Sequence, residues 1–153
     1  YQYLGRVVNI TVVIKNNGSV PETFNVTTYR NSTVIGTTLV TNLTVGENRT
    51  LIFNWNTLGL TPCQNWTIRA EAPLIGDANP SDNNVTNGTV KIKMLGDVNA
   101  DGVINLHDLV EASMAFGSVP GSWAWDPQAD ILQDGVINVV DFVRIAQRFG
   151  QSC

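Results

Sequence analysis

The residues best suited to chemistry are oxygen-bearing side chains that recur at short, regular intervals near the end of the chain. Five of them occupy positions one, three, five, nine and twelve of a predicted loop: Asp97, Asn99, Asp101, Asn105 and Asp108. Position seven is Val103, which would contribute its backbone carbonyl. Calcium takes roughly six to eight oxygen ligands, and the loop that wraps it needs a glycine at its sixth position. Gly102 stands there and permits the sharp turn. The spacing therefore predicts a calcium site.

The same pattern recurs 33 positions later, which indicates two copies of one supersecondary unit. The second set of candidate ligands is Asp130, Asp134, Val136, Asn138 and Asp141. Position three of this copy is Leu132, whose side chain cannot bind a cation, so we predict two calcium sites, the second weaker. Magnesium fits less well, because it prefers a rigid octahedron that keeps several waters. Ile104 and Ile137, at position eight, are predicted to point inward and to pair with each other.

A helix is predicted after each loop. Apolar residues recur at three- and four-residue steps from Leu106 to Met114 and from Val139 to Ala146. Gly117 and Gly150 stand where helix C-terminal cap glycines belong. The stretches before the loops are poor helix formers, so each unit is a calcium loop with an exiting helix, half of a full EF-hand.

These two units resemble a type I dockerin over residues 96–150. The resemblance rests on residues 97–108 of the first copy, and the second copy departs from it at Leu132. It implies a cohesin-like β-sandwich as the protein partner. Recognition in that family centres on loop positions ten and eleven, here Leu106-His107 and Val139-Val140 rather than the familiar Ser-Thr type. The apolar character suggests a surface buried against the neighbouring domain or another subunit, with His107 a surface or interface residue rather than a catalyst.

Charge divides the chain near residue 95. Residues 1–94 hold seven basic against five acidic side chains, and residues 95–153 hold two against eight, which gives the net charge of −4. We therefore predict two domains, 1–94 and 95–153. The predicted fold class is an N-terminal all-β immunoglobulin-like sandwich plus a small C-terminal α domain of two EF-hand-like calcium-loop–helix units.

Strand patterns fill residues 1–94. Apolar and polar residues alternate from Val8 to Lys15, and further strand patterns follow at intervals of roughly 8–12 residues, which is typical of a β-sandwich. Residues 5–93 resemble the CARDB group of immunoglobulin-like modules, on residues 5–18, 51–55 and 81–84. That family has a further strand before Gly5, where only four residues stand here. One sheet edge would then be open to a strand from another chain, unless the chain is trimmed or its first strand is divergent.

Nine Asn-x-Ser/Thr sequons lie in residues 1–94 and none in the rest of the chain. Their asparagines are Asn9, Asn17, Asn25, Asn31, Asn42, Asn48, Asn65, Asn84 and Asn87. This density favours N-glycosylation and a secreted or cell-surface protein. The alternative is that Asn and Thr replace charges on a polar face, since only 14% of residues are charged. A secreted protein tends to pair its cysteines, so Cys63 and Cys153 are candidates for a disulfide within or between chains.

Several function classes are disfavoured by composition. No apolar run approaches the ~18 residues of a membrane span, and a net charge of −4 argues against nucleic-acid binding. A chain that begins at Tyr1, without a methionine or signal peptide, suggests a processed mature form or a trimmed chain. His107 is the only histidine, and nearly all acidic residues of the second half belong to the calcium loops, so we do not expect an enzyme.

The prediction for function is a non-enzymatic, calcium-stabilised extracellular structural or assembly protein. It would mediate protein–protein association at the cell surface, including as the subunit of a self-assembling filament. One alternative is a dockerin-type anchor for a separate cohesin-like receptor. A second is a carbohydrate-binding module that uses an exposed tryptophan, with Trp55, Trp66, Trp123 and Trp125 as candidates. For Trp123 and Trp125 we prefer the interpretation that their rings cover the thin core of a small domain.

Overall fold

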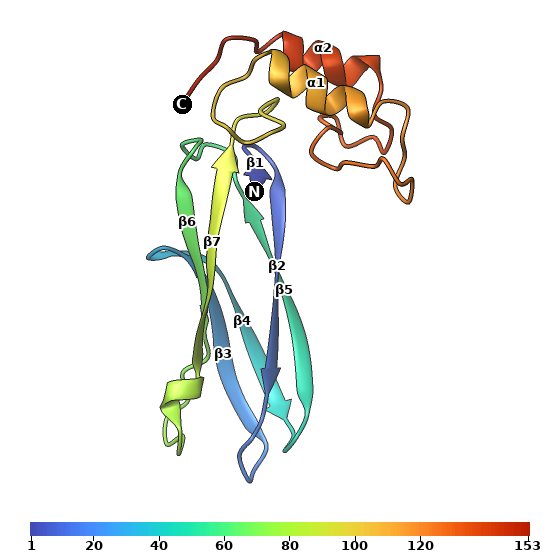
Figure 1. The fold of residues 1–153 in the computed structure, drawn as a ribbon. Helices are drawn as coiled ribbons and strands as arrows, with labels where there is room; N and C mark the ends of the chain where they lie inside the picture. Colours follow the sequence, from blue (N-terminus) through green and yellow to red (C-terminus); the bar gives the residue numbers. More distant parts are fainter. The chain divides into compact units, whose positions relative to one another are not determined.

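A computed structural model describes residues 1–153, which form two compact units (Figure 1). Residues 5–58 and 65–90 make up the first, here called the sandwich unit. Residues 1–4, 59–64 and 91–153 make up the second, here called the loop unit. Neither helix is long and apolar enough to cross a membrane.

Seven strands and two helices are present. The strands are β1 (Gln2–Tyr3), β2 (Val7–Lys15), β3 (Glu22–Arg30), β4 (Thr33–Leu43), β5 (Asn48–Asn56), β6 (Asn65–Glu71) and β7 (Asn84–Lys93). The helices are α1 (Leu106–Met114) and α2 (Val139–Ala146), with a single 3-10 turn at Pro80–Asp82. One sheet has the order β1-β7-β6-β3-β4, and β2 pairs antiparallel with β5 in a second sheet.

The sandwich unit follows from the period-two pattern of its strands. Along β2 the residues alternate between exposed and half-buried, and Ile10, Val12 and Ile14 face inward. They pack on a core whose most buried members are Val26 of β3 and Val40 and Leu43 of β4, in the other sheet, and Phe53 of β5 beside β2. Side chains that alternate across a strand place one apolar row between two sheets and one polar row in solvent.

The prediction of a separate C-terminal helical domain made of two EF-hand-like units is wrong. The chain is mostly β, with two helices of nine and eight residues, and these helices share a compact unit with β1, residues 59–64 and the end of β7. The core beside the helices includes Tyr3 and Met94, with Cys63 packed against it. Two short helices bury too little apolar surface to be stable alone. The sequence pattern of residues 95–153 could not show that side chains from elsewhere complete their core.

The helices of the loop unit begin at two equivalent capping boxes. Asn105 and Asn138 accept hydrogen bonds from the backbone N–H groups of His107 and Val140, while the N3 carboxylates of Asp108 and Asp141 bind the N-cap backbone. Such boxes satisfy N–H groups that the first helical turn leaves unpaired. The last residue of each calcium-loop pattern is therefore also part of a helix start.

Candidate metal centre

Loop 1, defined as residues 97–108, is held together by its own carboxylates. Asp97 and Asp108 are fully buried. One oxygen of Asp108 accepts hydrogen bonds from the N–H groups of Val98 (2.7 Å) and Asn99 (3.3 Å), and the other accepts from Asn105 N–H (2.8 Å). Asp97 Oδ2 accepts from Gly102 N–H at 3.2 Å. These bonds bend the backbone back on itself around the first and last acidic residues.

The remaining candidate ligands of loop 1 are engaged near the surface. Asp101 is exposed, and its Oδ1 accepts from Val103 N–H at 2.8 Å. Asn99 Nδ2 donates to Asp101 Oδ2 at 3.0 Å. The three loop carboxylates do not form a cluster as tight as the one in the second loop.

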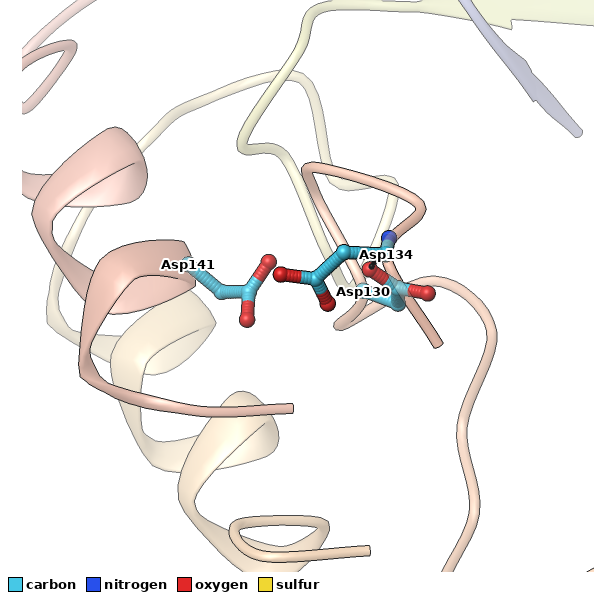
Figure 2. A group of neighbouring side chains, drawn as sticks. All are labelled: Asp130, Asp134 and Asp141. Carbon is cyan, nitrogen blue, oxygen red and sulfur yellow. Dashed lines mark hydrogen bonds between the residues drawn. The ribbon is translucent and has the colours of Figure 1, made fainter. Parts of the chain in front are cut away.

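Loop 2, defined as residues 130–141, repeats these bonds and gathers its carboxylates. Asp130 accepts from the N–H groups of Asp134 and Gly135, and Asp141 accepts from those of Leu132 and Asn138. Figure 2 shows Asp141 reaching from α2 toward the two other carboxylates. One oxygen from each of the three acids lies within 4.8 Å of the others. The loop predicted to be weaker is thus the one whose acids lie closest together.

The fit of a cation to loop 1 rests on Asp97. Its Oδ1 is buried and has no hydrogen-bond partner, which is costly for a carboxylate oxygen. Burial, together with the nearby charge of Asp108, raises the pKa of the Asp97 carboxyl above its usual value. An orphaned oxygen at the first ligand position is what a hard cation would satisfy. The oxygen-rich donor set suits Ca²⁺ rather than a thiolate-binding metal.

The two position-eight isoleucines are fully buried in one core cluster, but their backbones do not pair with each other. Ile104 N–H donates to Gln151 and its carbonyl accepts from Gly150, while Ile137 exchanges equivalent bonds with residues 117 and 118. Gly117 and Gly150 have φ of +78° and +84°, as expected of glycines that end a helix. The chain leaving each helix therefore pairs with the loop of the other copy.

Two lysines that the sequence interpretation missed reach loop 1. Lys93 Nζ donates to the Val98 carbonyl at 2.9 Å, and Lys91 Nζ donates to the Ala100 carbonyl at 3.3 Å. Lys93 is 1% exposed, and burial lowers the pKa of its ammonium group to about 8, although the charge of Asp97 opposes this shift. Both lysines stand at the end of a strand just before an acidic loop. A lysine at a strand end just before an acidic loop is the sequence signal that could have identified them.

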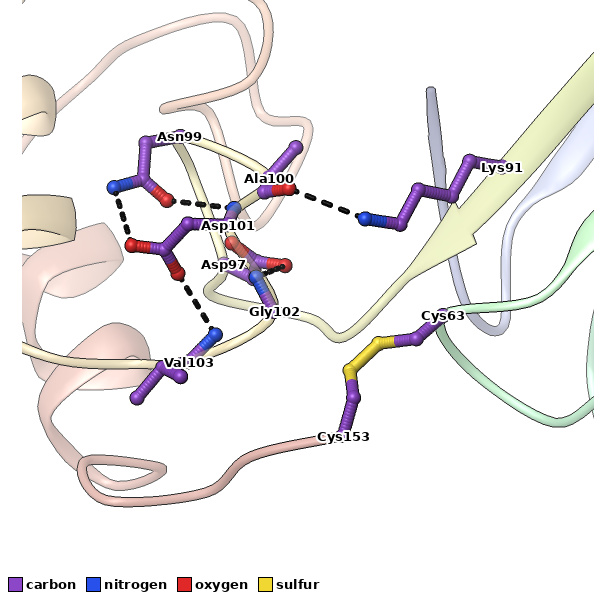
Figure 3. The surroundings of a disulfide bond; sticks show 9 residues. All are labelled: Cys63, Lys91, Asp97, Asn99, Ala100, Asp101, Gly102, Val103 and Cys153. Carbon is purple, nitrogen blue, oxygen red and sulfur yellow. Dashed lines mark hydrogen bonds between the residues drawn. A yellow bond between two sulfur atoms is a disulfide. The ribbon is translucent and has the colours of Figure 1, made fainter.

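A disulfide joins Cys63 to Cys153, with the Cα atoms 6.1 Å apart (Figure 3). Cys153 N–H donates to the Gly102 carbonyl at 3.0 Å, so the end of the chain lies along loop 1. Ser152 forms a β-bridge with Val103 beside this bond. A disulfide suits an oxidising compartment outside the cytosol.

The outer faces of the two helices carry apolar side chains in solvent. Their members are Leu106, Val110, Met114, Val139, Val140 and Val143, here called the helix face. Leu106 and Val139, at loop position ten, are 62% and 64% exposed, so neither is buried within this chain. His107 is exposed as well.

The tryptophans divide by burial. Trp55 is buried and Trp66 half-buried, with their rings edge to face at a centroid distance of 6.5 Å. Trp125 packs against the core of the loop unit, which agrees with a covering role. Trp123 is 99% exposed and is the candidate for ligand contact that the structure leaves accessible.

All nine sequon asparagines are exposed. Asn9 and Asn25 lie on the outward rows of β2 and β3, as their phase predicts. Asn16, which is not part of a sequon, is buried and donates to the Leu43 carbonyl. The side chains that glycosylation needs are thus accessible at every predicted position.

The second sheet has only two strands. β2 is hydrogen-bonded to β5 alone, so its other edge is unpaired. A groove of about 550 Å³ is lined by residues 12–15 of β2, by Asn16 after it, and by residues 70–72 and 83–85. The four residues before Gly5 do contain a short strand, β1, but it pairs with β7 in the other sheet and leaves this edge of β2 unpaired.

Comparison with known proteins supports one of the two resemblances. No family model matches the chain, and no curated protein does. A CARDB domain from Pyrococcus furiosus, solved in complex with di-metal ions, is 23% identical; the match covers 60% of this chain and 78% of that one, with a TM-score of 0.52. The sandwich unit has the CARDB fold. The metal ions are a feature of that protein alone.

Two further likenesses are looser. A domain of a putative cell surface protein from Methanosarcina acetivorans is 24% identical over 60% of this chain and 82% of that one, with a TM-score of 0.48. A type II cohesin-dockerin domain from Bacteroides cellolosolvens is 38% identical over 41% of this chain and 95% of that one, with a TM-score of 0.36. TM-scores below 0.5 are too low to define a shared fold.

Proposed function

We propose that this chain is a non-enzymatic, calcium-stabilised module of the cell exterior that associates with other proteins through the helix face. The observation that carries the proposal is the exposure of that face. Six apolar side chains on two adjacent helices remain in water, the least exposed of them at 44%. Large apolar side chains left exposed on neighbouring helices are typical of a surface that another protein covers.

Calcium would act through the helix starts. Asp108 and Asp141 are the last ligand candidates of their loops and also the N3 residues of α1 and α2. An ion that binds the folded loops and not the unfolded chain stabilises the fold by its binding free energy. Calcium would therefore fix the ends of the helices that present the helix face. Two sites are proposed, with Leu132 weakening the second.

An extracellular location is proposed from two independent features. The disulfide requires an oxidising environment to persist, and the nine accessible sequons suit a glycosylated surface protein. The sequons all lie within residues 1–94, so the helix face carries none of them. Surface left free of glycans is available for protein contact.

The partner we propose is a second copy of the chain, which would lead to head-to-tail assembly into a filament. The unpaired edge of β2 offers a second contact for such assembly, because an exposed edge can accept a strand from another chain. A separate cohesin-like β-sandwich receptor is the alternative occupant of the helix face. The two are distinguished by whether the purified chain associates with itself.

Sedimentation velocity of the full chain in millimolar calcium and in EDTA tests this proposal. We expect larger species in calcium that disappear in EDTA and in a variant with Leu106→Asp and Val139→Asp. Ile52→Asp is the matched control, because Ile52 on β5 is equally exposed at 63%. A chain that stays monomeric in calcium at high concentration would rule out self-assembly and favour the separate receptor.

Carbohydrate binding remains a second candidate because Trp123 is almost fully exposed. Exposed tryptophan rings supply large apolar contact surfaces for ligands. Binding to a glycan array that is lost in Trp123→Ala and kept in the helix-face variant would support this function. Unchanged binding in Trp123→Ala would reject it.

A further inference from the structure

Four carbonyl groups of loop 1 are held from outside the loop. They belong to positions two, four, six and eight, and their donors are Lys93 Nζ, Lys91 Nζ, Cys153 N–H and Gly150 N–H. The donor–acceptor distances are 2.9, 3.3, 3.0 and 2.7 Å, in that order. The alternate carbonyls that calcium does not use are thus fixed by two other parts of the loop unit.

The end of the chain is itself anchored by the disulfide. Cys63 and its neighbour Gln64 are bonded to the end of β7: Cys63 N–H donates to the Ile92 carbonyl at 2.5 Å, and Ile92 N–H donates to the Gln64 carbonyl. The disulfide therefore ties residues 150–153 to the same strand that supplies Lys91 and Lys93. Figure 3 shows Lys91 reaching the Ala100 carbonyl of loop 1, with the disulfide beside Gly102 of the same loop.

Gly102 shows how closely the disulfide approaches the loop. A Cβ atom added there would lie 3.5 Å from Cys153 Sγ, and the residue has a φ of +92°. Position six of a calcium loop makes the sharp turn that brings the ligands on both sides together. The disulfide thus packs directly on the turn of loop 1.

Loop 2 has no second disulfide and no second pair of lysines to match those at loop 1. Its position-eight carbonyl accepts from Gly117, which mirrors the bond in loop 1. The only lysines of the chain are Lys15, Lys91 and Lys93, and the only cysteines are Cys63 and Cys153. Two of the three lysines and the one disulfide are therefore used at loop 1.

We propose that the Cys63–Cys153 disulfide is a positioning element for calcium at loop 1, so that the redox state of the disulfide sets the calcium affinity of loop 1 but not of loop 2. The inference rests on the proposed binding of calcium. An ordered loop loses less conformational freedom when it binds its ion than a loop whose turn is free to move. Reduction frees the end of the chain and removes the support of Gly102.

The coupling must hold in both directions. If the disulfide raises calcium affinity at loop 1, calcium must make the disulfide harder to reduce by the same factor. Reduction by dithiothreitol transfers two electrons: the reagent closes to a cyclic disulfide, and Cys63 and Cys153 each gain a thiol hydrogen. The equilibrium constant of this exchange is a readout that does not depend on protein association.

Calcium titration calorimetry on single-loop variants of the full chain tests the proposal. Asp134→Ala leaves loop 1 as the working site, and Asp101→Ala leaves loop 2. Each is measured with the disulfide intact and with the double change Cys63→Ser and Cys153→Ser. We expect the loop 1 dissociation constant to rise about tenfold without the disulfide and that of loop 2 to change less than about twofold.

A second measurement avoids cysteine variants, which can fail to fold. The unchanged chain is equilibrated with dithiothreitol in saturating calcium and in EDTA, and its thiols are counted by mass after alkylation. We expect calcium to lower the exchange constant about tenfold, with Asp101→Ala abolishing the effect and Asp134→Ala preserving it.

Different results would overturn the disulfide inference and the proposed calcium-stabilised function. Calcium that binds both loops with affinities independent of the disulfide would overturn this inference and leave the calcium-stabilised function standing. An equal weakening of both loops would also overturn it, because that result means general destabilisation. If calcium bound neither loop of the oxidised chain, both proposals would be overturned.

Discussion

Lys93 Nζ lies 4.3 Å from the centre of the Tyr3 ring. The two residues also pair across the parallel contact between β1 and β7. An ammonium group over an aromatic face is attracted by the ring electrons, and the attraction strengthens when water is excluded. This contact brings the first residues of the chain into the core that supports the helices, and it places a buried positive charge beside loop 1.

The buried lysine predicts a pH dependence of stability in EDTA. Its pKa is about 8 in the folded chain and about 10.5 when exposed, so between these values the unfolded chain binds more protons. Stability should therefore rise with pH through this window and be lost as pH falls toward 8. We expect the free energy of unfolding to increase by about 1–2 kcal/mol from pH 7.5 to about 9.5.

Urea unfolding of the unchanged chain and of Lys93→Met checks this dependence. The variant should lose the increase, because it has no proton to release in that range. Lys15→Met is the control, since Lys15 is exposed at the end of β2. An identical pH profile in Lys93→Met would assign the effect to other groups.

The first strand should stabilise the helices. Tyr3 is 5% exposed, belongs to the core beside α1 and α2, and donates its hydroxyl to the Gln128 carbonyl at 2.6 Å. Tyr3→Ala should therefore cost about 3 kcal/mol and lower the melting temperature of the helical signal at 222 nm. Tyr1→Ala, at a residue 67% exposed, should cost less than about 0.5 kcal/mol. Equal melting curves for the two variants would mean that the helices are independent of β1.

The sequence predicted the strands better than the organisation of the C-terminal part. Alternation in β2 identifies its inward row, because period-two patterning is local and one face of the strand is buried. The helices and the glycines that follow them were likewise predictable from short segments. The core that unites them with Tyr3 and Cys63 depends on contacts between residues far apart in the chain, which spacing alone does not encode.

The candidate ligands of the proposed metal centre follow from the sequence, whereas the groups that support loop 1 do not. Asp97 and Asp108 are identified by loop spacing, and the structure buries both. Lys93 carries no motif, and its role follows only from the strand that ends beside loop 1. A disulfide between the two cysteines was predictable, but its contact with Gly102 was not, because that contact depends on how the end of the chain folds back on loop 1.

Because Leu132 occupies a ligand position of loop 2, replacing it with an oxygen-bearing residue should raise the calcium affinity of that loop. Leu132→Asn adds a side-chain oxygen where loop 1 has Asn99, with little change in volume. We expect the loop 2 dissociation constant to fall about tenfold when measured by calorimetry in the Asp101→Ala background. Leu132→Met adds no oxygen and is the matched control. A tighter site in both variants would point to packing rather than to a new ligand.

The sequons predict a mass increase and a pattern of occupancy. In a host with Asn-linked glycosylation, we expect the intact mass to exceed 16.6 kDa by several glycan units, because all nine acceptor asparagines are exposed. Thr27→Ala should remove one unit by disrupting the Asn25 sequon. Asn54→Gln should remove none, since Asn54 is equally exposed but lies outside any sequon. A single unglycosylated mass would instead assign the asparagines and threonines to a polar outer face without glycans.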